Sequence, residues 1–71
     1  MQEHVELEVS LEVIMSEIAQ TMFKLSHEKD TQKKELINSE LNKLIELQEE
    51  AYKGNRKAVK KILNREYINY E

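Results

Sequence analysis

The clearest pattern of apolar positions lies in the middle of the chain, between Lys34 and Gly54. Leucine, isoleucine and alanine recur there every three or four residues, the spacing that places them on one face of an α-helix. We therefore predict a helix over residues 31–53. Its apolar face holds Ile37, Leu41, Leu44, Ala51 and Tyr52, with Ile45 at one edge and with Leu36 and Leu47 widening it on the other side. Every other element has to pack against this helix or against a second copy of it.

Gln48 interrupts this face at a position where an aliphatic side chain is expected. One interpretation is a buried amide that fixes the register or the oligomeric state, as in coiled coils. The alternative is a position near the helix end where the amide reaches solvent. We favour the second interpretation, because side-chain amides are mostly exposed.

The first apolar segment fits two periods. Between Val5 and Val13, apolar and polar residues alternate as in a half-buried β-strand. A strand here would pair only with the short tail at residues 67–70 or with a second copy of itself. A helical stripe also fits and continues well past the alternating stretch: Leu7, Leu11, Ile14, Ile18, Met22 and Leu25. We therefore predict a helix over residues 5–27.

This first helix carries a second, partly apolar face. A helical projection places Val5, Val9, Val13 and Phe23 roughly opposite the main stripe. A helix that is apolar on two sides is usually covered from both sides, and one short chain offers little material for that. We interpret these four residues as a candidate partner surface. We expect a homodimer in which the first helices or the hairpins form a four-helix-type core.

Met15 and Met22, together with Phe23, also fit an adaptable protein-binding surface. Methionine at helical spacing more often fills a core. We therefore expect both methionines to serve as core residues.

Two boundaries divide the chain into three helices. Asp30 or Thr31 follows a polar stretch and fits the N-cap of the second helix, so a short link joins two antiparallel helices. Gly54, the only glycine, fits a left-handed helix end, and Asn55 fits the N-cap of a third helix over residues 56–67. The apolar face of the third helix is Ala58, Val59, Ile62, Leu63, Tyr67 and, past the predicted end, Tyr70.

The predicted fold class is therefore all-α: a long antiparallel helical hairpin plus a shorter third helix, which dimerises into a helical bundle. We expect residues 1–71 to form one small domain. The composition supports helix, since the sequence has one glycine, no proline and abundant Glu, Lys, Leu and Ile. A chain of this length buries a modest core, and the absence of cysteine excludes disulfides as reinforcement.

The charge is distributed unevenly, although the net charge is only −3. Residues 1–23 contain five glutamates and no basic residue, whereas residues 54–71 contain five basic and two acidic residues. The basic residues form a candidate basic surface on the third helix: Arg56, Lys57, Lys60, Lys61 and Arg65. We expect the acidic first helix to lie beside the basic third helix. Phosphate contact by the basic residues is the alternative interpretation.

Few residues are candidates for catalysis or metal binding. Ser26, His27 and Asp30 include the residue types of a hydrolase triad, but adjacent positions in a turn do not give the buried, oriented base that a triad needs. Glu46 and Glu50 share a helix side as in di-iron bundles, but the inward-facing Glu-x-x-His pairs are missing from the sequence. We expect no catalytic residues, no metal and no cofactor.

No apolar run approaches the roughly 20 residues that span a bilayer, and the acidic start does not resemble a secretory signal. We expect a cytoplasmic protein with no membrane partner. The sequence thus predicts a non-enzymatic interaction module, a regulator or adaptor that acts through protein–protein contacts. The alternative function is a nucleic-acid-associated regulator that uses the basic third helix, which the net acidic charge disfavours.

Overall fold

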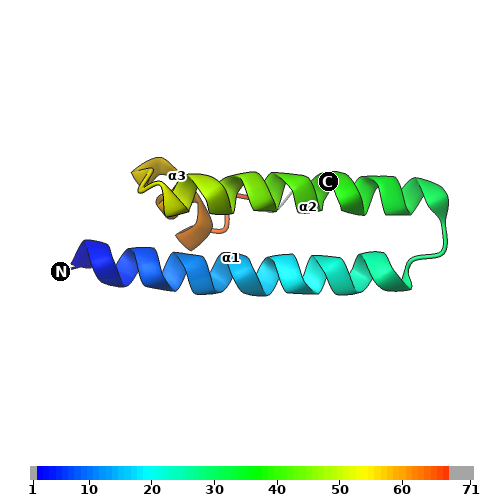
Figure 1. Cartoon of the computed structure of the whole chain (residues 1–71), viewed down its shortest axis with the longest axis horizontal. Helices are drawn as coiled ribbons and strands as arrows, with labels where there is room; N and C mark the ends of the chain where they lie inside the picture. The colour runs from blue at the N-terminus through cyan, green and yellow to red at the C-terminus, as the bar shows by residue number, and fades with distance from the viewer. Residues whose placement is uncertain (1, 68–71) are drawn as a thin grey trace.

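The computed structural model describes residues 2–67. This part of the chain contains three α-helices and no strand: α1 (Gln2–His27), α2 (Thr31–Tyr52) and α3 (Arg56–Leu63). α1 and α2 run antiparallel and are joined by a short link (Figure 1). The all-α prediction is confirmed, and residues 5–13 belong to a helix. The apolar residues at helical spacing beyond the alternating stretch therefore decided its structure.

Side-chain caps start the second and third helices as the sequence indicates. The Asp30 carboxylate accepts a hydrogen bond from the Gln32 amide at 2.9 Å. The Asn55 side chain accepts hydrogen bonds from the amides of Lys57 and Ala58 at 3.0 and 3.4 Å. Gly54 has a φ of +86°, a left-handed conformation that L-residues with a Cβ rarely adopt. The chain therefore turns sharply after α2 and continues into α3.

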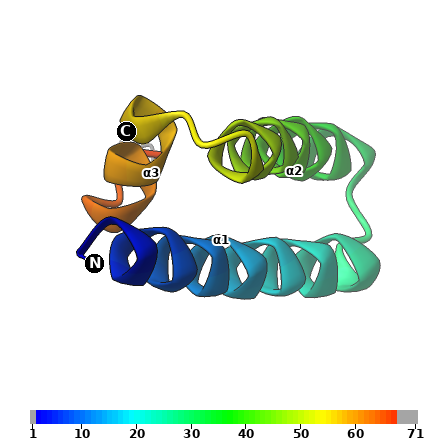
Figure 2. The same cartoon turned by 60° about the vertical axis from the view of Figure 1, so that its left-hand side comes forward.

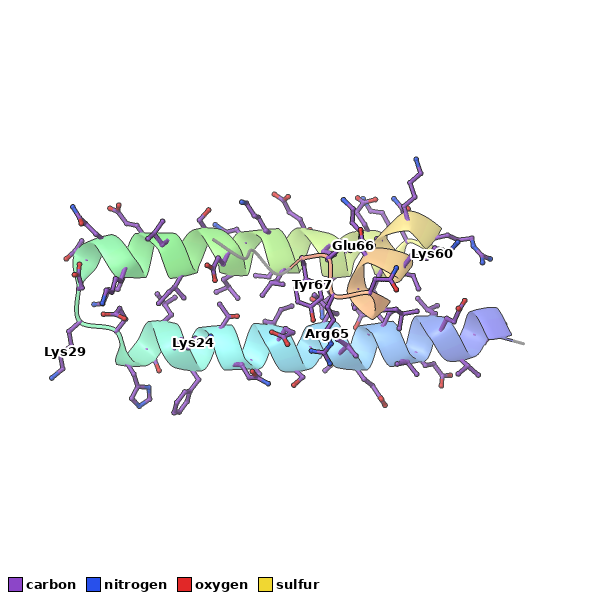
Figure 3. All side chains as sticks on the ribbon, turned by 180° about the vertical axis from the view of Figure 1, so that it is seen from behind. Lys24, Lys29, Lys60, Arg65, Glu66 and Tyr67 are labelled. Carbon is purple, nitrogen blue, oxygen red and sulfur yellow. The ribbon has the colours of Figure 1, made fainter. Side chains whose placement is uncertain are left out.

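α3 packs on one side of the hairpin, near the end where α1 begins and α2 finishes (Figure 2). Figure 3 views the side that α3 covers, and Figure 1 views the opposite side. We call the end with α3 the open end of the hairpin, and the end with the α1–α2 link the loop end. This position leaves the loop end of the hairpin without a third helix among residues 2–67.

α3 is shorter than predicted. It ends at Leu63, and residues 64–67 form a turn in which Arg65 has a left-handed φ of +57°. This turn folds Tyr67 back over the hairpin (Figure 3). The predicted helix over residues 56–67 is therefore wrong in its last turn, while Tyr67 still packs against the core. Tyr70 lies outside the described residues.

The core lies where the three helices meet. Its buried hydrophobic residues come from all of them: Ile14, Leu44, Ala51, Ala58, Val59 and Ile62. Ile14 and Ile62 are fully buried, which places the contact between α1 and α3 at the centre of the core. Leu41, nearer the loop end, is also buried. These residues follow the apolar stripes of the sequence.

Some residues predicted for the apolar faces are exposed instead, among them Leu36 at 66%. Met22 is 54% exposed and Tyr52 is 63% exposed. Ser10 and Thr21 occupy buried positions of α1, where each hydroxyl donates a hydrogen bond to a carbonyl one turn earlier, at 2.8 Å. Because a helix turns by about 100° per residue, Thr21 and Met22 cannot both face the core, and the smaller residue lies inside.

Candidate functional site

The candidate partner surface on α1 is divided by the structure. Val5, Val9 and Phe23 are exposed on the outer side of α1, and Phe23 is 66% exposed. The Phe23 ring lies against the His27 ring with a centroid distance of 4.2 Å. Val13 is half-buried and packs against the core cluster, so it does not share the exposure of the other three.

A larger apolar surface lies on the side of the hairpin that α3 leaves uncovered. On α1, the α3 side is marked by Glu17, whose carboxylate pairs with the Arg65 guanidinium at 3.5 Å. Met15 and Met22 lie on the opposite flank of the core stripe, since a helix turns by about 100° per residue. Both methionines are 54% exposed. The uncovered flank of α1 is therefore apolar over two helical turns.

α2 completes this surface. Its α3 side is marked by Lys43 and Leu47, which line a groove together with Tyr67. The opposite flank carries Ile45 and Tyr52, both exposed, and the half-buried Gln48 lies between that flank and the core. We name the two-helix surface the hairpin face and define it by its exposed apolar residues: Met15, Met22, Ile45 and Tyr52.

The hairpin face was partly indicated by residues that are visible in the sequence. Met15 and Met22 were recognisable as an adaptable surface, but expecting them in the core hid that role. Ile45 lies at the edge of the predicted apolar face of α2. Which flank of the hairpin stays uncovered depends on the side against which α3 packs. The helical period of the apolar residues does not specify that side.

The predicted basic residues lie on the exposed side of α3 and in the turn that follows it. All five side chains are exposed: Arg56, Lys57, Lys60, Lys61 and Arg65. Arg65 pairs with Glu17 on α1, as expected from an acidic first helix beside a basic third helix. Lys61 lines a groove with three glutamates, Glu46, Glu50 and Glu66. The basic surface is therefore interrupted by acidic side chains.

Tyr67 is a partly buried phenol with a perturbed pKa. Burial raises the pKa of its phenol above the ordinary 10.0, the nearby Glu17 carboxylate raises it further, and Arg65 lowers it. Its hydroxyl oxygen is enclosed and makes no hydrogen bond within standard geometry to residues 2–67. A groove beside it is lined by both acidic and basic side chains, including Lys24, Glu40 and Lys43. These features are those of a packed tyrosine at a groove edge.

The polar residues near the α1–α2 link do not form a hydrolytic arrangement. Ser26 and the Nδ1 atom of His27 are 3.0 Å apart, but both residues are exposed. The Asp30 carboxylate is used at the N-cap of α2. Within residues 2–67, no group of three or more His, Asp or Glu side chains is placed to hold a metal ion.

Comparisons with known proteins add no relatives: no family model matches the chain, and no curated protein or solved structure matches it. None of the helices in the described part of the chain is both long enough and apolar enough to cross a membrane. Any functional interpretation therefore rests on the surfaces described above.

Proposed function

We propose that this protein is a non-enzymatic helical interaction module, a small regulator or adaptor, that acts through protein–protein contacts and forms a homodimer. The observation that carries the proposal is the hairpin face, where two helices expose four large apolar side chains on the flanks that α3 leaves uncovered. Contiguous apolar surface on a small protein is characteristic of interaction sites. A cytoplasmic location is part of the proposal and rests on the absence of cysteine, which fits a reducing compartment.

The thin core supports self-association. Seven hydrophobic residues of the described chain are buried, and six of them belong to the cluster beneath α3. The loop end is a two-helix layer, which cannot enclose a core from both sides. Chains of this size that lack disulfides and metals commonly gain burial by oligomerisation. A second layer of helices over the hairpin supplies that burial.

Nucleic-acid binding ranks second. The basic side chains of α3 are exposed while its apolar side is in the core, which is the observation in its favour. The acidic side chains around Lys61 weaken phosphate attraction. A salt series of binding to generic duplex DNA tests this alternative. Binding whose log–log salt slope falls when Lys60 and Lys61 are changed to alanine supports it, and no binding at low salt removes it.

Sedimentation equilibrium over the micromolar range tests the main proposal. We expect a dimer that dissociates on dilution. We also expect the melting temperature to rise with protein concentration, because association stabilises only the folded chain. A folded monomer at all concentrations, with an unchanged melting temperature, contradicts self-association.

A further inference from the structure

The geometry points to a second copy of this chain, packed antiparallel on the hairpin face, as the occupant of that face. The inference rests on the proposed self-association and adds to it the interface and the orientation. The open end of each copy lies over the loop end of the other. The two-fold axis then lies in the plane of the interface, perpendicular to the helices.

The outline of the face limits the area that a second copy can cover. Seen from the uncovered side, the molecule is 45 Å long and 20 Å wide (Figure 1). Because the axis derived below lies toward the loop end of α1, the first turns of α1 stay outside the overlap and the footprint is smaller than the roughly 800 Å² per partner of a standard interface, which fits a dimer that dissociates on dilution. The centre of the face is apolar, with Met15, Met22 and Ile45, and its charged residues lie toward the two ends. An apolar centre with a charged rim is the usual anatomy of such an interface.

The levels of the two helices follow from the groove on the α3 side. That groove is lined by Glu17 and Thr21 of α1 together with Glu40 and Leu44 of α2. Residues 17–21 of α1 therefore lie level with residues 40–44 of α2. Counting along both helices at 1.5 Å per residue places Glu49 level with the segment around Glu12. The same count places Lys34 level with the last turn of α1.

The charges along the face have opposite signs at its two ends. Glu8 and Glu49, both exposed, flank the hairpin face toward the open end. Lys34, also exposed, flanks it near the loop end. Antiparallel packing brings Lys34 of each copy against Glu49 of the other, so that both pairs are satisfied by a single two-fold axis.

Parallel packing gives the opposite result. With the loop ends together, α1 of one copy lies over α2 of the other at the same level. Glu49 then faces Glu8 and Glu12 of the second copy, which are like charges, and Lys34 faces the last turn of α1, near Ser26. Like charges across an interface oppose association. The charge order therefore selects the antiparallel dimer.

The two methionines of the face agree with the same axis, whereas Ile45 lies at the level of Asn38 of the other copy. An axis midway between Lys34 and Glu49 on α2 crosses α1 near Ala19, close to the midpoint between Met15 and Met22. Met15 of one copy then packs on Met22 of the other. Methionine side chains are unbranched and fill such contacts readily. The outer residues Val5, Val9 and Phe23 and the basic side chains of α3 stay outside this interface.

Charge reversal tests the pairing. We expect Lys34→Glu and Glu49→Lys each to raise the dissociation constant of the dimer roughly 10-fold, because each substitution turns two exposed ion pairs into two repulsive contacts. The double variant Lys34→Glu with Glu49→Lys restores it to within about 2-fold. Lys57→Glu, an equal charge change on α3, is the matched control and leaves the constant unchanged. Circular dichroism confirms that helix content is retained in each variant.

Disulfide trapping tests the orientation, and the chain contains no cysteine to interfere. Chains with Lys34→Cys and chains with Glu49→Cys are mixed and oxidised, and we expect mixed dimers, since linked Cα atoms must lie within about 7 Å. A mixture of Lys34→Cys and Ser26→Cys chains is the control for parallel packing.

The outcomes separate the two proposals. A wild-type dimer in which the 34/26 mixture is trapped instead, or in which the double charge variant stays weak, overturns the antiparallel interface and leaves self-association standing. A monomeric wild-type chain overturns both. Trapping of the 34/49 mixture together with recovery in the double charge variant supports the inference.

Discussion

The two ends of the hairpin differ in what covers them. At the open end, α3 packs on α1 and α2, and six of the seven buried hydrophobic residues lie in this three-helix cluster. At the loop end, two helices face each other alone within residues 2–67, and the buried residues there are Thr21 and Leu41. Exposed Met22, Phe23 and Leu36 lie in this thinner half. The open end therefore supplies most of the stability of one chain, while the loop end contributes less.

The largest expected effect separates the two ends directly. Ile14→Ala at the open end should cost about 2–5 kcal/mol in the free energy of unfolding, since Ile14 is fully buried in the core cluster. Leu25→Ala at the loop end removes a half-buried side chain and should cost less than about 2 kcal/mol. Urea unfolding at one fixed protein concentration measures both. Equal losses would contradict the comparison.

Gly54→Val tests how α3 is held at the open end. A Cβ at this position meets no atom within 4 Å, so the penalty comes from the left-handed backbone alone. We expect a loss of about 1–2 kcal/mol, and more than for Gly54→Asn, because asparagine tolerates this conformation better. Thermal unfolding measures the difference. An unchanged melting temperature for the valine variant would mean that α2 continues through residue 54 in solution.

The two helix caps give a matched pair, one at each end. Asn55→Ala removes a side chain that accepts hydrogen bonds from two amides, and Asp30→Ala removes one that accepts from a single amide. Each should cost about 1 kcal/mol, with the larger loss at Asn55 because α3 holds the core together. Chemical denaturation of both variants compares them. A larger loss for Asp30→Ala would mean that the loop end contributes more to the free energy of unfolding than the open end does.

Tyr67→Phe should have the smallest effect at neutral pH. Its enclosed hydroxyl makes no hydrogen bond of standard geometry within the described chain, so its removal should be neutral or slightly stabilising. Because folding raises the pKa of this phenol above 10.0, the folded chain keeps a proton that the unfolded chain releases. The stability that this phenol contributes is complete below pH 10. It is lost as the pH rises through the pKa of the phenol in the folded chain.

Urea unfolding between pH 9 and pH 11 measures this dependence as the difference between wild type and Tyr67→Phe. The phenylalanine variant should lose less stability over this interval than wild type does, since the other titrating groups are common to both. Parallel curves for the two proteins would mean that the phenol is solvated.

Much of the fold follows from short-range features of the sequence. The apolar stripes at helical spacing, the cap residues Asp30 and Asn55, and the left-handed Gly54 specify three helices and two turns. The end of α3 was not predictable in the same way. Arg65 adopts a left-handed conformation at a position where a glycine would have indicated a helix end. The sequence therefore contains no residue type that predicts the turn at residues 64–67.

The candidate surfaces were less predictable, because exposure depends on which flank a third helix covers. Met22 was placed in the core because it is apolar, yet Thr21 is buried there with its hydroxyl bonded to the Glu17 carbonyl. Val13 was predicted on the outer face of α1, but it is partly buried and packs against the core cluster. Both results depend on packing between helices that are distant in sequence. Apolar content alone does not contain that information.

The pairing of Arg65 with Glu17 joins positions 48 residues apart. In any chain that contains this sequence, α1 is synthesised first and the helix that covers Ile14 is synthesised last. The α1–α2 pair can form before α3 docks, and its formation shortens the loop that α3 must close. The three-helix cluster is then assembled only after residue 62 has left the ribosome. The most stable end of the protein is therefore the last to form during synthesis.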